Sequence, residues 1–174
     1  GYAMMPIATA LGHTVRLVVW DRHSTHPGVA TFRTAPWRYF QSAVSRANRV
    51  LGLEDLVAPA AIGLIRHPWF AEADLVHAHL IDHDWFGAAL FPAIARRRPL
   101  AVTVHSAIAA TGGCYYPREC GKWRTGCNGA CPHPRGPSPL HRRTPALQWR
   151  GKRLAYRHTD MTLVAASRWT AGYL

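Results

Sequence analysis

Four short apolar segments, each followed by residues of helical or loop character, constrain the fold of this chain more than any other feature. Their residues are mostly β-branched or otherwise apolar, as in strands that are buried on both faces. Because such strands alternate with helices, the sequence predicts an α/β fold: a Rossmann-like parallel sheet with helices on both faces. Ligands bind sheets of this kind at the carboxyl ends of the strands. The four segments are residues 14–20, 74–80, 99–105 and 160–165.

Helical periodicity is clearest between the first two of these segments. From Trp37 to Leu51 apolar residues recur at spacings of three and four, which predicts an amphipathic helix with its apolar side against the core. Pro36 and Gly52 are expected at its start and its end. The other expected elements are a polar loop over residues 21–35, helices over residues 85–97 (broken near Pro92) and 144–158, and a helix capped by Ser167.

The composition indicates a globular domain. With 48% hydrophobic residues among 174, the chain can bury a core, which excludes a disordered tail, and its four cysteines are too few for a small disulfide-rich scaffold. The cleanest apolar run, residues 85–95, is too short to span a membrane and contains Gly87 and Pro92. Because the chain starts at Gly1 and stops soon after a predicted helix start, we expect it to be part of a longer protein.

Positive charge is concentrated in the second half of the chain. Residues 1–84 carry seven arginines and seven acidic residues, whereas residues 85–174 carry 14 Lys plus Arg against two acidic residues, which accounts for the net charge of +12. Such asymmetry indicates an anionic partner. On the helix expected over residues 144–158, Arg150, Arg153 and Arg157 share one face, which is either a solvated surface or a surface that docks on an anionic membrane.

Histidines are the candidate functional residues at the strand ends. His105 ends the third apolar segment, where a neutral imidazole can bond a sugar hydroxyl or a phosphate, or else cap a backbone carbonyl. His77 and His79 alternate along the second segment and therefore face one side of the sheet. They are either a metal-binding pair or two imidazoles buried against a helix and bonded to the backbone. Asp82 follows that segment and is a candidate ligand contact.

All four cysteines lie in one loop rich in glycine and proline, residues 106–143, which we call the cysteine loop. Within it, Gly112 and Gly113 either leave backbone amides open to a ligand or form an ordinary turn. A loop this long in a compact domain is usually functional or held by a metal. Four thiolates can wrap a tetrahedral zinc ion, and the same cysteines can instead form two disulfides or remain free thiols. They are Cys114, Cys120, Cys127 and Cys131.

Five segments of the sequence, taken together and in order, resemble a known family. They are LGHTV at residues 11–15, ADLVHAH at 73–79, VTVH at 102–105, TGGCYY at 111–116 and ASRW at 166–169. With them the chain resembles the N-terminal domain of retaining family 4 glycosyltransferases of the GT-B fold. The closest subgroup is the one with a cysteine-bearing loop, found in exopolysaccharide (colanic-acid-type) assembly enzymes. The chain departs from the family pattern at Ser106, where an acidic residue is usual, at Ile108, where an aromatic is usual, and in its last cysteine pair, which is one residue further apart.

The resemblance implies that residues 1–174 are an incomplete domain. Its first strand would precede Gly1, and a second domain that binds most of a nucleotide-sugar donor would follow Leu174. The resemblance makes His105 the expected catalytic residue. The confinement of the four cysteines to one loop makes them the expected ligands of a structural zinc. The expected acceptor-binding residues are Ser106, Thr111, Gly112, Gly113 and Asp82.

The activity that the resemblance implies is transfer of a sugar, with retention, to a saccharide or lipid-linked acceptor in cell-surface polysaccharide synthesis. The protein would work in the cytoplasm, peripheral to the inner face of the plasma membrane, and this chain alone would not turn over. Two other classes compete: a zinc-stapled basic nucleic-acid-binding module and a non-catalytic membrane-docking α/β domain. We expect no nucleic-acid partner, because aromatic residues are not interleaved with the basic residues as stacking platforms would be.

Overall fold

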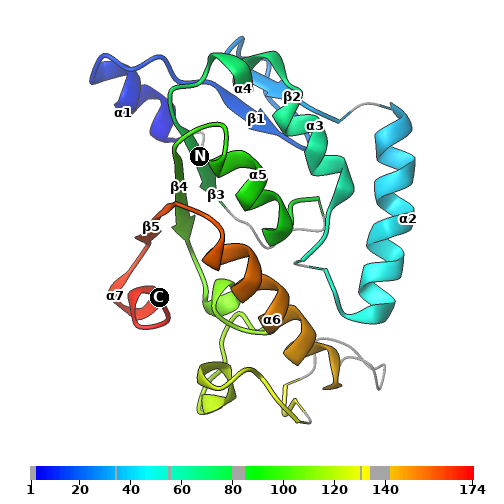
Figure 1. Cartoon of the computed structure of the whole chain (residues 1–174). Coiled ribbons are helices and arrows are strands. Elements are labelled where there is room, and N and C mark those ends of the chain that lie inside the picture. Colours follow the sequence, from blue (N-terminus) through cyan, green and yellow to red (C-terminus); the bar gives the residue numbers. More distant parts are fainter. Residues whose placement is uncertain (1–2, 34, 55, 80–84, 130, 134–141) are drawn as a thin grey trace.

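A computed structural model describes residues 3–33, 35–54, 56–79, 85–129, 131–133 and 142–174 of the chain. Strands and helices alternate along it (Figure 1), and η denotes a 3-10 helix. In chain order the elements are α1 (Met4–Ala10), β1 (Leu17–Val19), β2 (Val29–Thr31), α2 (Ala35–Leu51), η1 (Pro59–Ala61), α3 (Ile62–Ile65), α4 (Pro68–Glu72), β3 (Val76–His79), η2 (Ala88–Leu90), α5 (Phe91–Ala95), β4 (Leu100–Val104), η3 (Ala107–Ala109), η4 (Gly121–Arg124), α6 (Thr144–Arg157), β5 (Thr162–Ala165) and α7 (Arg168–Ala171).

The strands form two small parallel sheets. β3, β4 and β5 pair in that order, with Ala78 opposite Val102 and Val102 opposite Leu163, while β1 pairs with β2 alone. The predicted α/β fold with parallel strands is therefore confirmed. The described strands make two hydrogen-bonded sheets where the sequence predicted one.

Strand β2 lies in the segment that the sequence predicted to be a polar loop, so that prediction is wrong. Val29 is buried, and the three residues of β2 are too few to show a period of two in the sequence. The first sheet is supported by an aromatic cluster in which Phe32 packs against Trp20 and Trp85, with ring centroids 5.6 and 5.8 Å apart. The pairing with β1 and this aromatic cluster hold β2 in place, although the composition of the segment does not predict a strand.

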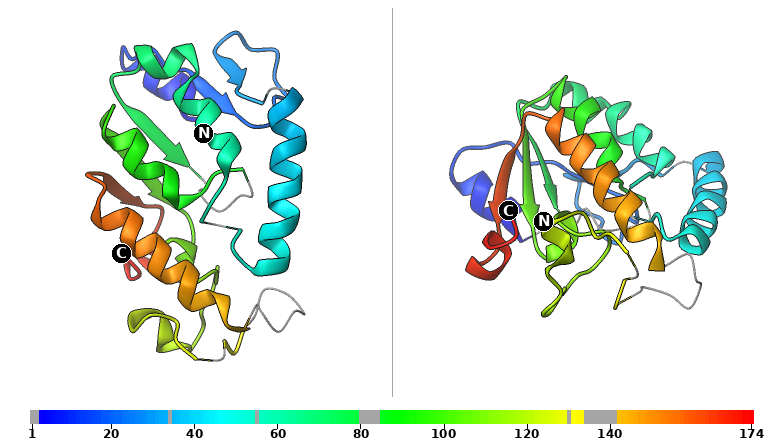
Figure 2. Two further views of the ribbon diagram at one scale, coloured as in Figure 1. Left: turned by 45° about the vertical axis from the view of Figure 1, so that its right-hand side comes forward. Right: turned by 60° about the horizontal axis from the view of Figure 1, so that its bottom comes forward.

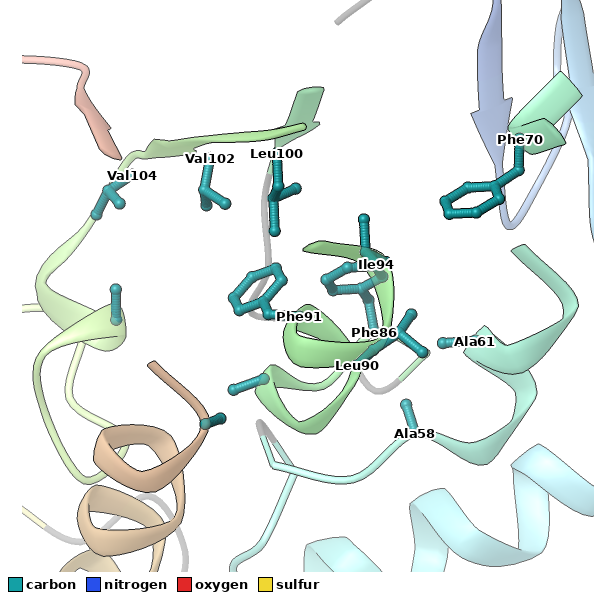
Figure 3. Packing of buried hydrophobic residues seen from close by; sticks show 13 residues of the cluster. Ala58, Ala61, Phe70, Phe86, Leu90, Phe91, Ile94, Leu100, Val102 and Val104 are labelled. Atoms are coloured by element: carbon teal, nitrogen blue, oxygen red, sulfur yellow. The ribbon is translucent and has the colours of Figure 1, made fainter. Parts of the chain in front are cut away.

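Helices α5 and α6 cover one side of the three-stranded sheet, and α1 lies on the other side (right-hand view of Figure 2). Alternate residues of β4, Leu100, Val102 and Val104, point into the main core (Figure 3). There they meet Phe91 and Ile94 of α5, both fully buried. The other side of β4 is therefore free to carry polar side chains.

Several helix boundaries follow the predicted signals. α6 matches the expected helix over residues 144–158, and Ser167 caps α7 in a capping box with Thr170. The helical segment expected over residues 85–97 is divided in two near Pro92, as predicted: η2 ends at Leu90, and Pro92 lies in the first turn of α5, where a proline costs no hydrogen bond. In the described residues, no helix combines the length and apolar character needed to cross a bilayer.

Helix α2 is oriented differently from the prediction. Its buried residues are polar, Gln41, Ser45 and Asn48, whereas Phe40 and Leu51 of the predicted core side are 51% and 43% exposed. The predicted packing of the apolar side against the core is therefore wrong. The end of the helix is as predicted, because Gly52 follows it with a left-handed φ of 69°.

Candidate functional site

Three histidines from neighbouring strands line one face of the three-stranded sheet. His77 and His79 of β3 have ring centroids 4.2 Å apart, and His105, directly after β4, lies 5.7 Å from His79 by the same measure. His79 Nδ1 and His105 Nε2 are within hydrogen-bond distance at 3.4 Å. We call these three residues the histidine row. Its face is opposite to the one that carries Val102 and Val104.

The bonds of the row are made by side chains. His77 Nε2 lies 2.7 Å from the hydroxyl of Thr103, a buried residue of β4. His77 and His105 are exposed. His77 and His79 share one side of the sheet as predicted, but the alternative of two buried imidazoles bonded to the backbone is wrong. His105 occupies the predicted position at the carboxyl end of β4.

The electrostatics of this face favour neutral imidazoles at His77 and His79. Burial, and after it the neighbouring His77, lower the pKa of His79 from 6.5 to about 4. His77 is exposed as a whole residue, but partial desolvation of its imidazole also lowers its pKa. A neutral His79 can donate one hydrogen bond and accept another. It can therefore hold the His105 ring in one orientation without adding charge to this face.

The loop that follows His105 turns its polar groups inward. Ser106 is buried and caps η3, since its hydroxyl accepts the N–H of Ile108 at 3.4 Å. The Thr111 hydroxyl, also buried, donates to the Cys114 carbonyl at 2.8 Å and accepts the Cys114 N–H at 2.9 Å. These contacts give Ser106 and Thr111 a role in shaping the loop. Contact between these residues and an acceptor stays a prediction.

Helix α6 clamps this loop along one of its faces. A Cβ on Gly112 would overlap the Pro145 carbonyl, so only glycine fits there. Trp149 Nε1 donates to the Trp123 carbonyl at 2.7 Å, and the buried Lys152 ammonium donates to the carbonyls of Ile108 at 2.8 Å and Thr111 at 3.2 Å. Gly112 and Gly113 are themselves buried. Their predicted contact with a ligand stays a prediction, and the segment that approaches Gly112 closely in the structure is the backbone of Pro145.

The four cysteines are free thiols that influence one another. Burial, and after it the thiols of Cys131, Cys127 and Cys120, raise the pKa of Cys114 from 9.0 to about 11. Burial also raises the pKa of Cys127, whose Sγ accepts the Gly112 N–H at 3.3 Å. The Lys152 ammonium acts in the opposite direction and favours the thiolate of Cys127. At neutral pH the thiols of Cys114 and Cys127 therefore carry protons, which a metal would have to displace.

The donor set suits zinc, but the sulfurs are not gathered around one point. Within the described ranges, no three His, Cys, Asp or Glu side chains are grouped closely enough to hold a metal ion. Mutual electrostatic effects reach further than a Zn–S bond of about 2.3 Å, so they do not by themselves establish a coordination site. Binding of zinc would therefore require the loop to tighten. Two non-glycine residues of the loop, Arg118 and Cys127, have left-handed φ angles of 51° and 53°, which shows that the loop is already tightly turned.

Two hollows flank η4. One, of about 480 Å³, lies on the core side of β4 and β5, between Val104, Tyr156 and Trp149. The other, of about 350 Å³, lies between the cysteine loop and α7. Its lining includes Arg118, Cys120, Arg124, Arg168 and Trp169. Among the described residues, neither hollow is lined by the histidine row, Ser106, Thr111, Gly112 or Gly113.

The second hollow is bounded by segments that follow two strands at the same edge. The cysteine loop follows β4 and α7 follows β5, and aromatic rings connect them: Tyr116 lies 5.3 Å from Trp169, and Trp123 lies 4.9 Å from Tyr173, between ring centroids. Parallel strands end at the same edge, where ligands bind. The hollow is therefore at the edge that the sequence predicted to be functional.

The sequence analysis missed several residues of this region. Lys152 was not singled out, although it is the buried cation nearest the loop. Arg168 and Trp169 were recognised only as part of a motif. They follow a predicted strand, so the rule that placed His105 at the carboxyl end of its strand also places them at the carboxyl edge of the sheet. Aromatic and basic residues also pair in space, as in Arg153 over Trp149 at 4.9 Å, a pair at the i,i+4 spacing of a helix that the sequence analysis overlooked. Asp82 lies outside the described residues.

Comparison of the chain with protein-family models, with curated proteins and with solved structures finds no match. The geometry of the carboxyl edge and the residues that line it are therefore the basis on which a function is proposed.

Proposed function

We propose that this chain is the acceptor-binding half of a retaining glycosyltransferase that moves a sugar from a nucleotide-sugar donor to a saccharide or lipid-linked acceptor in cell-surface polysaccharide synthesis. The observation that carries the proposal is the placement of His105. It is exposed at the carboxyl end of β4, and His79 orients it. An exposed side chain that is held by a neutral neighbour at this edge is suited to contact a ligand, because the ligand site of a parallel sheet lies there.

In this proposal His105 is the catalytic residue. In the reaction, the bond between C1 of the donor sugar and the diphosphate oxygen breaks, an acceptor hydroxyl oxygen bonds to C1, and the proton of that hydroxyl leaves with the diphosphate. The imidazole of His105 hydrogen-bonds the reacting sugar or the departing phosphate. His79 is a positioning residue, since it acts through the His105 ring.

The second hollow gives the acceptor a place close to the same edge. Trp169 offers an aromatic face for a sugar ring, and Arg118, Arg124 and Arg168 supply hydrogen-bond donors and positive charge. Ser106, Thr111, Gly112 and Gly113 hold the loop that forms one wall. The nucleotide-sugar donor would bind mainly to a second domain after Leu174.

Zinc is proposed as a structural element of the same wall. Cys114, Cys120, Cys127 and Cys131 would be its ligands, with the Lys152 ammonium and the Gly112 N–H offsetting the negative charge of the thiolates. Zinc supplies cross-linking of the loop in this proposal and takes no part in sugar transfer.

The proposed location is the cytoplasmic face of the plasma membrane. Arg150, Arg153 and Arg157 of α6 are exposed, in keeping with the expected face that docks on anionic headgroups. The guanidinium of Arg153 also covers the ring of Trp149, and Arg124 covers Trp123 at 4.9 Å, so these rings are not open platforms for stacking nucleic-acid bases.

The experiment for this proposal is an activity assay of the whole protein with labelled nucleotide sugars and saccharide or lipid-linked acceptors. Incorporation of label into an acceptor, with retained anomeric configuration, supports the proposal. A folded protein that transfers no sugar from a broad donor panel, yet binds single-stranded or duplex nucleic acid in a salt-dependent way, contradicts it and favours the nucleic-acid-binding class.

A further inference from the structure

Helix α2 presents an apolar surface to solvent along most of its length. Tyr39, Phe40, Val50 and Leu51 are 67%, 51%, 62% and 43% exposed. At 100° per residue these side chains fall on one side of the helix, together with the exposed Ala43 and Ala47. We call these six residues the α2 apolar face. In all the views α2 stands at the edge of the molecule, far from the three-stranded sheet (Figures 1 and 2).

Polar bonds on the other side of α2 fix this orientation. The side-chain oxygen of Gln41 accepts the N–H of Ala60 at 3.0 Å, and Asn48 donates to the Val57 carbonyl at 2.8 Å. Gln41 also donates to Ser45 at 3.1 Å. Rotating the helix to bury its apolar side would leave these buried polar groups without partners, at a cost of about 1–3 kcal/mol each. The outward apolar face is therefore built into the fold.

The side chains along one edge of the α2 apolar face are basic, and we call them the arginine row. Arg38, Arg46 and Arg49 are exposed and lie on adjoining positions of the helical wheel, and the helix contains no Asp or Glu. Trp37 packs edge-on against Phe40 at 5.9 Å between ring centroids, so three aromatic residues gather at the start of the helix. An apolar face with aromatic residues beside an arginine row is the pattern of a helix that lies in the interface of an anionic bilayer.

We infer that α2 docks this protein on anionic membranes, with the α2 apolar face inserted among the lipids and the arginine row on the phosphate groups. Charge complementarity selects this occupant. A second copy seated on the same face would bring the arginine rows of both helices to one interface with no acidic residue on either helix, which is unfavourable. The inference does not rest on the proposed glycosyltransferase activity, and it assigns membrane insertion to a helix other than α6.

Co-sedimentation of the full chain with vesicles tests this inference. Parent protein is compared on phosphatidylcholine vesicles that contain phosphatidylglycerol and on phosphatidylcholine alone. We expect binding to the first and little to the second. In the variant Tyr39→Ser/Phe40→Ser/Val50→Ser, the fraction bound at limiting lipid should correspond to an affinity lower by about tenfold or more. The melting temperature should not fall, because all three side chains are more than half exposed.

Three further variants separate the causes. Ile7→Ser on α1 removes an equally exposed helical residue, at 65%, and should leave binding unchanged. Arg38→Ala/Arg46→Ala should weaken binding by about fivefold per arginine at low salt and less at high salt. Arg150→Glu/Arg153→Glu/Arg157→Glu reports the electrostatic contribution of α6. Should the triple serine variant fold poorly, Val50→Ser alone gives the same direction of change.

Three results would overturn the inference. One is a folded triple serine variant that binds like the parent. Another is an equal loss in the Ile7→Ser variant, which would assign binding to apolar surface in general. The third is a parent protein that forms dimers in sedimentation velocity runs and loses them with the triple serine substitution, which would assign the face to a second copy.

Discussion

The histidine row ends at His105, where the cysteine loop begins, yet the row and the loop are held in different ways. The loop is fixed by buried contacts with α6, in which Gly112 meets Pro145 and Lys152 binds two carbonyls. The row rests on side-chain bonds at a largely exposed face of the sheet. The difference indicates a division of roles: the loop makes the fold rigid beside the site, and the row is available to a ligand. Changes at the contacts between the loop and α6 should therefore destabilise the protein, and changes in the row should leave its stability nearly unchanged.

The largest expected effect is that of Gly112→Ala. The added Cβ would overlap the backbone of Pro145, and neither segment can yield without moving α6 or the loop. We expect a loss of about 3 kcal/mol or more in the free energy of unfolding, measured by denaturant titration. Gly121→Ala is the control, since a Cβ there meets nothing within 4 Å, and should change stability by less than about 0.5 kcal/mol. Equal small effects at both positions would show that the contact of Gly112 with Pro145 does not fix the loop.

Lys152→Met should destabilise the protein next most strongly. The substitution keeps the apolar stem but leaves the Ile108 and Thr111 carbonyls without their charged donor, at a cost of about 2–3 kcal/mol. Arg150→Met on the exposed side of the same helix is the matched control and should stay within about 0.5 kcal/mol of the parent. If the two variants have the same melting temperature, the bonds of Lys152 do not hold the loop against α6.

Measuring the zinc content of the purified protein tests whether the four cysteines of the loop bind a metal. We expect protein purified without added metal to contain close to one zinc per chain, and we expect metal binding to release protons from the thiols. Cys127→Ser should raise hydrogen exchange and protease sensitivity over residues 114–131 while leaving the exchange of β3–β5 unchanged. Metal-free protein with four titratable thiols would rule out a zinc site, and a uniform rise in exchange would show that the loop supports the whole fold.

The smallest expected effect on stability concerns acid. The pKa of His79 is about 4 in the folded chain and 6.5 when unperturbed, so between these values the unfolded state binds a proton that the folded state does not. Stability should therefore fall as the pH is lowered from about 6.5 to about 4 and should level off above that window. His79→Gln should flatten part of this slope in melting experiments. The pH dependence of stability that remains in this variant includes the contribution of His77, whose pKa is also lowered. A variant with the slope of the parent would show that the imidazole of His79 is not shielded.

The sequence predicted those features that depend on local signals. Apolar runs located β3, β4 and β5, and proline, glycine and serine punctuation located the ends of α2 and the start of α7. The carboxyl-edge rule placed His105 correctly. Apolar periodicity did not predict which side of α2 is buried, because partners distant in sequence decide it. Gln41 and Asn48 are buried because the backbone groups of residues 57–60 bond to them, and the local sequence of the helix carries no signal of these bonds.

The site was only partly predictable for the same reason. Lys152 is 41 residues from Thr111 along the chain, so its bond to that loop depends on how α6 packs. The pairing of His79 with His105 spans 26 residues and follows from strand order, which a single sequence leaves open. The separation into two sheets likewise reflects which strand edges meet, and apolar runs do not encode this.

The proposed function depends on His105 taking part in sugar transfer and contributing little to the scaffold, and the substitution His105→Ala in the whole protein distinguishes these two roles. An exposed imidazole at the sheet edge should contribute little to stability and much to transfer. We expect turnover to fall by about tenfold or more while the melting temperature stays within a few degrees of the parent. A large drop in melting temperature with residual activity that tracks the folded fraction, or unchanged turnover in a folded variant, would contradict the account.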